Sequence, residues 1–277
     1  RKLAESALTR SCAVSEEQKV KEGAIARPTI SRGYYIDAAR AFEKAEKLPP
    51  GPERDKAWRE AAALYKVALE KAPARDEAPE AAMNGAYCYK QVGEYDQAIE
   101  MYELFIREYG NEENLTKLEK GDPRGEPPAE PDPRRYGERV KYLKTANDAL
   151  AAAYVLFFDY RRAAGSYDTI SKNKRFEESE RRDAARNAVL LHANVGDEDK
   201  MMASRQTLYG LNAPAKQKAE IDFLVASADL KRWDPNGRDE GQNRVSRQRA
   251  INAMDAYYGR NRTNPDTAMF VVQAAYH

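Results

Sequence analysis

The chain has 277 residues, of which 42% are hydrophobic and 33% are charged. Its 46 basic and 45 acidic side chains leave a net charge of only +1, so no bulk attraction favours nucleic acid or an acidic membrane surface. The longest apolar stretch, residues 149–158, is about half of the roughly 20 residues that a membrane-spanning helix needs. A mean hydropathy of -0.83 and scattered β-branched residues favour solvated helices and almost no sheet.

Helical patterns divide the chain into five predicted segments. Residues 1–32 form an N-terminal helical or irregular segment. Residues 33–110 form helix pairs, and their first amphipathic helix, residues 33–48, ends at the Pro49-Pro50-Gly51-Pro52 run. An insert covers residues 111–139, further helix pairs cover 140–210, and degenerate helical repeats cover 211–277. The last pattern, residues 266–276, resembles the opening helix of a truncated repeat, so we expect a piece of a longer array.

One spacing of alanine and bulky residues recurs three times. The copies are Ala61-x3-Tyr65-x2-Ala68, Ala98-x3-Tyr102-x2-Phe105 and Ala163-x3-Tyr167-x2-Ile170. One helix upstream of the second and third copies lie Ala86-x2-Tyr89 and Ala151-x2-Tyr154. Alanine at these positions lets two helices approach closely where they cross, and the tyrosines fill the space beside the crossing.

This pattern resembles the tetratricopeptide repeat, in which a helix A, a short turn and a helix B occupy about 34 residues. The resemblance implies an all-α fold, an α-solenoid of antiparallel helix pairs wound into a right-handed superhelix. Gly93 would end one helix A and allow the sharp reversal. The fourth copy departs from the pattern, because Met201 and Arg205 stand where alanine and an aromatic are usual.

The insert contains Pro123, Pro127, Pro128, Pro131 and Pro133 among charged residues. We expect a long loop or mobile segment there, because so few apolar residues cannot form a core. A second interruption around Trp233-Asp234-Pro235-Asn236-Gly237 reads as a tight turn, with Trp233 packing it down.

Residues for catalysis or metal binding are scarce, so we predict no enzyme, no cofactor and no metal. Of the two histidines, His192 falls at a position that is aromatic in the better repeats and His277 is the last residue. Packing therefore explains His192 better than acid or base chemistry. Cys12 and Cys88 have no metal-ligand spacing, and the acidic turn at Asp234 lacks the EF-hand pattern.

A solenoid of this kind binds partners on its concave face, which helix A residues line. The predicted groove residues are Met83, Tyr87, Lys90, Gln91, Asp148, Ala152, Val155, Arg186, Leu190 and Asn194, with Ala193 beside the last. Some tetratricopeptide co-chaperones clamp a peptide carboxylate with Lys and Asn at set helix A positions. Here Met83, Tyr87, Asp148 and Ala152 occupy those positions, so the clamp is absent.

The leading hypothesis is a non-catalytic scaffold that binds a protein or peptide partner within a multiprotein assembly. The Ala- and Arg-rich irregular repeats resemble those of bacterial envelope assemblies, such as outer-membrane assembly lipoproteins or gliding-machine components, which implies an envelope-associated or periplasmic location. The alternative is a ligand-sensing module that binds a peptide, a peptidoglycan fragment or a glycan. A third class is an enzyme whose catalytic part lies outside this sequence.

Overall fold

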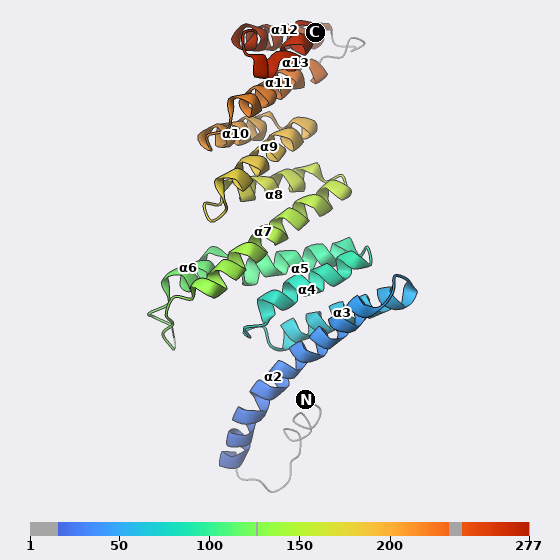
Figure 1. The fold of residues 1–277 in the computed structure, drawn as a ribbon, viewed down its shortest axis with the longest axis vertical. Helices are drawn as coiled ribbons and strands as arrows, with labels where there is room; N and C mark the ends of the chain where they lie inside the picture. Colours follow the sequence, from blue (N-terminus) through green and yellow to red (C-terminus); the bar gives the residue numbers. More distant parts are fainter. Residues whose placement is uncertain (1–15, 126, 233–239, 277) are drawn as a thin grey trace. The chain divides into compact units, whose positions relative to one another are not determined.

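The structure is a computed structural model that describes residues 16–125, 127–232 and 240–276. The chain divides between Ala146 and Asn147 into two compact units. Each unit is built from consecutive helices joined by short connections, and each is described by itself below (Figure 1).

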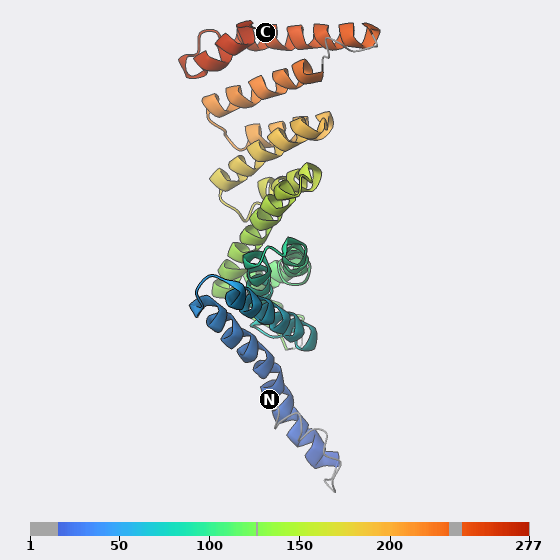
Figure 2. The same cartoon turned by 90° about the vertical axis from the view of Figure 1, so that its right-hand side faces the viewer.

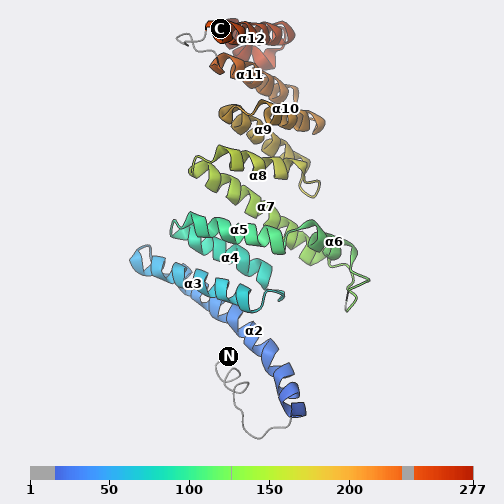
Figure 3. The same ribbon diagram turned by 180° about the vertical axis from the view of Figure 1, so that it is seen from behind.

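Unit 1 holds α2 (Glu16–Lys47), α3 (Pro52–Lys71), α4 (Ala78–Gln91), α5 (Tyr95–Glu108), α6 (Glu112–Lys120) and the first part of α7 (Pro133–Leu156). Helix α2 packs on α3, α3 on α4 and α4 on α5, so each helix contacts its neighbours in sequence. Seen from behind, α3, α4 and α5 lie in successive layers (Figure 3).

Unit 2 holds the rest of α7, then α8 (Tyr160–Lys172), α9 (Glu178–Val195), α10 (Glu198–Gly210), α11 (Ala215–Arg232), α12 (Glu240–Asn261), the short 3-10 helix η1 (Pro265–Thr267) and α13 (Ala268–Tyr276). The same nearest-neighbour packing joins α8 to α9, α9 to α10 and α11 to α12. Figure 2 shows α8 to α11 as layers that reverse direction from one helix to the next. The predicted all-α solenoid of antiparallel helix pairs is confirmed within each unit.

Close helix crossings occur where the alanine spacing predicts them. Ala86 and Ala98 are buried between α4 and α5, and Ala151 and Ala163 are fully buried in unit 2. The bulky partners behave less uniformly, since Tyr102 and Tyr154 are buried whereas Tyr89 and Tyr167 are half-buried. Small side chains at the crossings therefore set the distance between helices, as the sequence indicates.

The insert was expected to be a loop over residues 111–139, and this expectation is wrong in two places. Helix α6 begins after Asn111, whose side chain accepts a hydrogen bond from the Asn114 backbone nitrogen, and Leu115 on it is only 1% exposed. Helix α7 already begins at Pro133. One capping side chain and one buried leucine suffice for a short helix beside the larger core.

Elsewhere the helices run longer than the periodicity indicates. Helix α2 begins at Glu16 and continues through Pro28, so it joins the predicted 1–32 segment to the predicted 33–48 helix. Helices α11 and α12 contain the predicted 216–230 and 247–258 helices, and η1 and α13 cover residues 266–276. The predicted turn at Trp233 to Gly237 and the residue Cys12 lie outside the described residues.

Three equivalent turns reverse the chain by one hydrogen-bond pattern. The backbone nitrogen after the turn residue donates to a carbonyl five residues earlier, namely Glu94 to Tyr89, Asp159 to Tyr154 and Asp197 to His192. The turn residue has positive φ in each case: Gly93 (76°), Phe158 (59°) and Gly196 (72°). Glycine suits this left-handed conformation and phenylalanine does not, so Phe158 departs from the pattern while its ring is 77% exposed.

Enlarging a crossing alanine should destabilise the protein. Ala151→Leu is expected to lower the free energy of unfolding by about 1–3 kcal/mol, because a leucine has no room in the crossing. The control Ala152→Leu, at the adjacent exposed position, should change it by less than about 0.5 kcal/mol. Equal effects of the two changes in urea unfolding followed by circular dichroism would contradict this assignment.

Replacing the strained turn residue should stabilise the protein instead. Phe158→Gly is expected to raise the free energy of unfolding by about 1 kcal/mol, because glycine tolerates positive φ. At the equivalent turn, Gly196→Ala should lower it by about the same amount, since only backbone strain opposes the new Cβ atom. The same denaturation measurement checks both, and a destabilised Phe158→Gly variant would mean that the ring packs on the fold.

Candidate functional site

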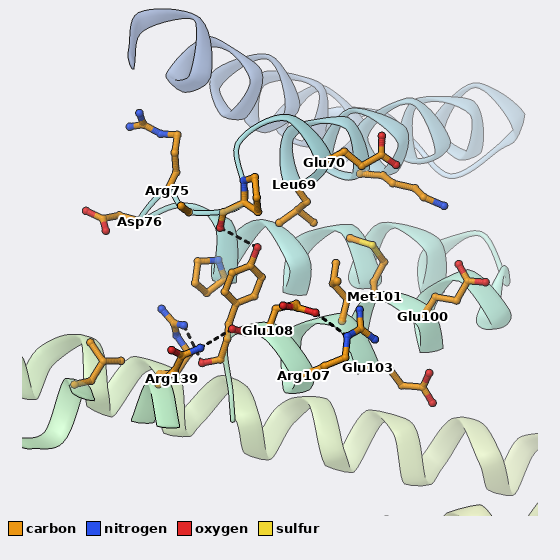
Figure 4. A pocket seen from close by; sticks show the side chains of 18 of the residues that line it. Leu69, Glu70, Arg75, Asp76, Glu100, Met101, Glu103, Arg107, Glu108 and Arg139 are labelled. Atoms are coloured by element: carbon orange, nitrogen blue, oxygen red, sulfur yellow. Dashed lines mark hydrogen bonds and ion pairs between the residues drawn. The ribbon is translucent and has the colours of Figure 1, made fainter. Parts of the chain in front are cut away.

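Unit 1 contains a pocket of about 900 Å³ bounded by α3, the α3–α4 loop, α5, α6 and the first turns of α7 (Figure 4). Its apolar lining comes from the second helices of two successive pairs and from the predicted insert. The apolar lining residues are Leu69, Pro73, Ala74, Pro79, Met101, Leu104, Tyr109 and Leu118. An apolar floor of this size is typical of sites that bind a ligand or a segment of another chain.

Two tyrosines fix the loop that forms one wall. The Tyr109 hydroxyl donates to the Pro73 carbonyl oxygen at 3.1 Å, and the Tyr35 hydroxyl donates to the Ala72 carbonyl oxygen at 2.7 Å. Burial raises the pKa of both tyrosines, so both hydroxyls remain protonated donors. The wall is therefore tied to α2 and to the end of α5, which preorganises the pocket.

Most charged groups on the rim are already paired. Arg107 and Glu108 approach to 2.7 Å, Lys117 and Glu113 to 2.8 Å, and Arg75 and Glu77 to 2.9 Å. The Arg75 guanidinium lowers the pKa of Glu77 through this hydrogen bond. These pairs leave the rim polar and the floor apolar.

Arg139 on α7 differs from the other rim cations. Its Nη1 donates to the Tyr109 carbonyl oxygen at 3.0 Å, and its Cζ lies 5.8 Å from the Tyr109 ring centroid. It makes no ion pair with a carboxylate in the part of the chain that the structure describes. Burial lowers the pKa of Arg139 most, and repulsion from Arg135 lowers it further, while Tyr109 and the Asp76 carboxylate oppose this shift.

The predicted groove residues of α4 do not line this pocket. Met83 was expected to face a partner, but it is 7% exposed and belongs to the core, so that prediction is wrong. Tyr87 is 41% exposed, and its ring centroid lies 5.9 Å from Phe42 and 5.7 Å from Trp58. Lys90 and Gln91 are exposed near the end of the helix. Of the four predicted groove residues of α4, Tyr87, Lys90 and Gln91 therefore remain open to a partner.

The predicted groove residues of unit 2 are split between α7 and α9. Asp148, Ala152 and Val155 are exposed on α7, and Asn194 is exposed near the end of α9. Leu190 and Ala193 are half-buried.

Arg186 forms an ion pair with Glu220 on α11, so its guanidinium already has a partner within the chain. This ion pair connects α9 to α11, and the expected role of Arg186 in a groove stays a prediction.

His192 takes part in a buried polar cluster. Its Nε2 lies 2.9 Å from Oδ2 of Asp168, while the Ser204 hydroxyl donates to Oδ1 of the same carboxylate at 2.7 Å. His192 is 2% exposed and Ser204 1%. The carboxylate lies between the imidazole and the hydroxyl, whereas nucleophile activation needs a direct bond between those two groups. The cluster ties α8 to α9 and α10, and the prediction that His192 packs in the core is confirmed.

The remaining candidates for chemistry are the Cys88 thiol and groups of possible metal ligands. Burial raises the pKa of the Cys88 thiol to about 12, which keeps it protonated and unreactive. Within residues 16–125, 127–232 and 240–276, no group of three or more His, Cys, Asp or Glu side chains is placed to hold a metal ion. None of the helices described there is both long and apolar enough to cross a membrane.

Sequence reasoning did not find this pocket, because its lining residues come from five separate segments. Arg139 lay at the edge of the predicted insert, and Leu118 lay inside it. One signal in the sequence could have indicated α6. Asn111 is a favourable helix-capping residue, and the acidic residues Glu112 and Glu113 follow it in the first turn.

Comparisons with known proteins give no family. No protein-family model matches the chain, and no curated protein sequence matches it. Among solved structures, the chain is similar to BtubC (BKLC) from P. vanneervenii, with 16% identity, 83% of this chain and 92% of that chain covered, and a TM-score of 0.38.

Removing the central carboxylate of the buried cluster should destabilise unit 2. Asp168→Ala is expected to lower the free energy of unfolding by about 1–3 kcal/mol, because the buried His192 loses its hydrogen-bond partner, while the Ser204 hydroxyl keeps the Lys200 carbonyl oxygen. The control Asp183→Ala, at an exposed site on α9, should change it by less than about 0.5 kcal/mol. A loss below that limit for Asp168→Ala, by chemical denaturation, would contradict a structural role for the cluster.

Proposed function

We propose that this protein is a tetratricopeptide-like adaptor, without catalytic activity of its own, that binds a protein or peptide partner within a larger assembly. The pocket of unit 1 is its principal docking site. The observation that supports the proposal most is the apolar lining of the pocket, in which the half-buried Leu104 and Leu118 lie beside the nearly buried Leu69 and Met101, beneath a rim of charged side chains.

Apolar side chains buried against such a floor supply affinity, at about 25 cal/mol for each Å² removed from water. Charged groups around the rim select among partners and orient them. Because α3 and α5, the helices on either side of α4, both contribute to the floor, an extended or helical segment of a partner can lie across them.

The exposed residues of α4 form a second surface in the proposal. Tyr87 presents an aromatic ring beside Lys90 and Gln91, on a helix whose pocket-facing neighbours are α3 and α5. A partner that occupies this surface instead of the pocket depends on Tyr87 and is independent of Leu104. The two sites are therefore separable by substitution.

A second candidate function is sensing of a small ligand. The pocket volume of about 900 Å³ falls within the range of about 300–1,000 Å³ that small-molecule sites occupy. Under this alternative, a peptidoglycan fragment, a glycan or a short peptide bound as a ligand raises the melting temperature of the protein.

Selection of a displayed random-peptide library on the purified chain tests the adaptor function. Enriched peptides are expected to bind at least about tenfold more weakly to Leu104→Glu, because a carboxylate on the floor opposes apolar burial. Val67→Glu, an exposed change on α3 outside the pocket, serves as the matched control and should bind normally. Leu118→Glu on α6 provides a second floor variant if Leu104→Glu unfolds.

Fluorescence anisotropy with the enriched peptides, together with melting curves of each variant, gives the readout. Failure to enrich any peptide would contradict the adaptor function. Peptides that lose binding with Tyr87→Ala and keep it with Leu104→Glu would instead place the site on α4.

A further inference from the structure

The position of Arg139 indicates what kind of group the pocket receives. The side chain leaves the second turn of α7 and lies against Tyr109, whose carbonyl oxygen accepts from Nη1 at 3.0 Å. Tyr109 is in turn held by its hydroxyl bond to Pro73. The guanidinium is thus oriented by the protein itself before any partner arrives, which lowers the entropy cost of binding.

The charge of Arg139 is poorly neutralised for its degree of burial. Asp76, a nearby carboxylate, is already paired with Arg135 at 2.5 Å, and the Arg75, Arg107 and Lys117 cations have their own carboxylates. Asp76 still attracts Arg139 but forms no ion pair with it, so the half-buried guanidinium is only partly neutralised, and a bound anion would lower the cost of its burial. Among the cations of the pocket that the structure describes, Lys66 also forms no ion pair, but its side chain is exposed to water.

The donors that remain on Arg139 suit a carboxylate. Since Nη1 is occupied by the Tyr109 carbonyl oxygen, the edge formed by Nε and Nη2 has no acceptor among the described residues. Two parallel N–H groups on one planar edge match the two oxygens of a carboxylate. Neither nitrogen is sealed from solvent, because neither belongs to the buried polar atoms without a partner.

The opposite end of the pocket carries most of the lining carboxylates, although Asp76 lies beside Arg75 at the first end. Figure 4 shows Arg139 and Arg75 at one end and Glu70 and Glu100 at the other, with Met101 between them. The lining carboxylates of α3 and α5 at that end are Glu70, Glu100 and Glu103, and Lys66 on α3 lies one turn from Glu70. Glu70 and Glu100 form no ion pair within residues 16–125, 127–232 and 240–276.

We propose that the pocket binds an internal segment of a partner protein that places an acidic side chain on Arg139, apolar side chains on the floor, and a lysine or arginine between Glu70 and Glu100. This inference rests on the proposed adaptor function. It adds the order in which acidic, apolar and basic side chains follow one another along the segment. The distribution of charged residues along the pocket determines this order. The charges at both ends give specificity and orientation, while the apolar floor supplies most of the affinity.

Three pools of fluorescent synthetic decapeptides test the inference. The first pool has capped ends and contains one Glu and one Lys separated by three to five apolar residues. The second is identical except that Gln replaces Glu. The third has no acidic side chain and carries a free C-terminal carboxylate. Anisotropy is measured against the full chain and its variants.

The first pool should bind at least about tenfold more tightly than the second and the third to the unaltered protein, because only it offers a side-chain carboxylate to Arg139. Arg139→Gln should abolish the preference of the protein for Glu over Gln peptides. Arg134→Gln, an exposed change on the same helix outside the pocket, is the matched control and should keep it. Arg139→Lys should keep only part of the preference, since a lysine lacks the two-donor edge.

Separate outcomes overturn the inference and the function on which it rests. If all pools bind equally and Leu104→Glu weakens them, the pocket is a docking site but the acidic anchor is refuted. If the third pool binds as tightly as the first or more tightly, Arg139 binds the C-terminal carboxylate of a chain, and the proposal of an internal segment is refuted. Absence of binding by every pool and every selected peptide contradicts the adaptor function itself. If Arg139→Gln fails to fold, the preference of Arg139→Lys for Glu over Gln peptides is compared with that of the unaltered protein. An undiminished preference then refutes the acidic anchor.

Discussion

The close approach of helices at alanine crossings is the constraint on which the rest of the structure depends. Ala86 with Ala98, and Ala151 with Ala163, allow two helices to lie against one another with little between them. Each pair then buries its larger side chains, such as Tyr102 and Tyr154, beside the crossing. Because each helix contacts mainly its neighbours, stability is built up locally from pair to pair.

That local construction explains which features the sequence predicts well. The alanine and tyrosine spacing repeats within about 40 residues, so the helix pairs and the role of His192 as a packed residue follow from pattern alone. The turn at Gly93 follows for the same reason, because its left-handed conformation requires a residue type that is visible in the sequence. The short helix α6 escaped prediction, because the burial of Leu115 that accompanies it does not show in the pattern of a nine-residue segment.

The pocket could not be predicted in this way. Leu69, Met101 and Arg139 belong to three helices, and only their packing brings them to one cavity. The family resemblance directed attention to the first helix of each pair, whereas the pocket lies against the second helices α3 and α5 and the insert. Met83 shows the same limit, since its position in the repeat suggested a surface and packing placed it in the core.

Arg139, which forms no ion pair among the described residues, and the apolar lining together carry the proposal that the pocket binds a partner segment. A crystal structure of the chain with a capped peptide from the Glu- and Lys-containing pool tests this account most directly. The account predicts the glutamate carboxylate on the Nε and Nη2 edge of Arg139, with apolar side chains over Leu69 and Met101. A peptide bound along α4 beside Tyr87, with the pocket empty, would contradict it.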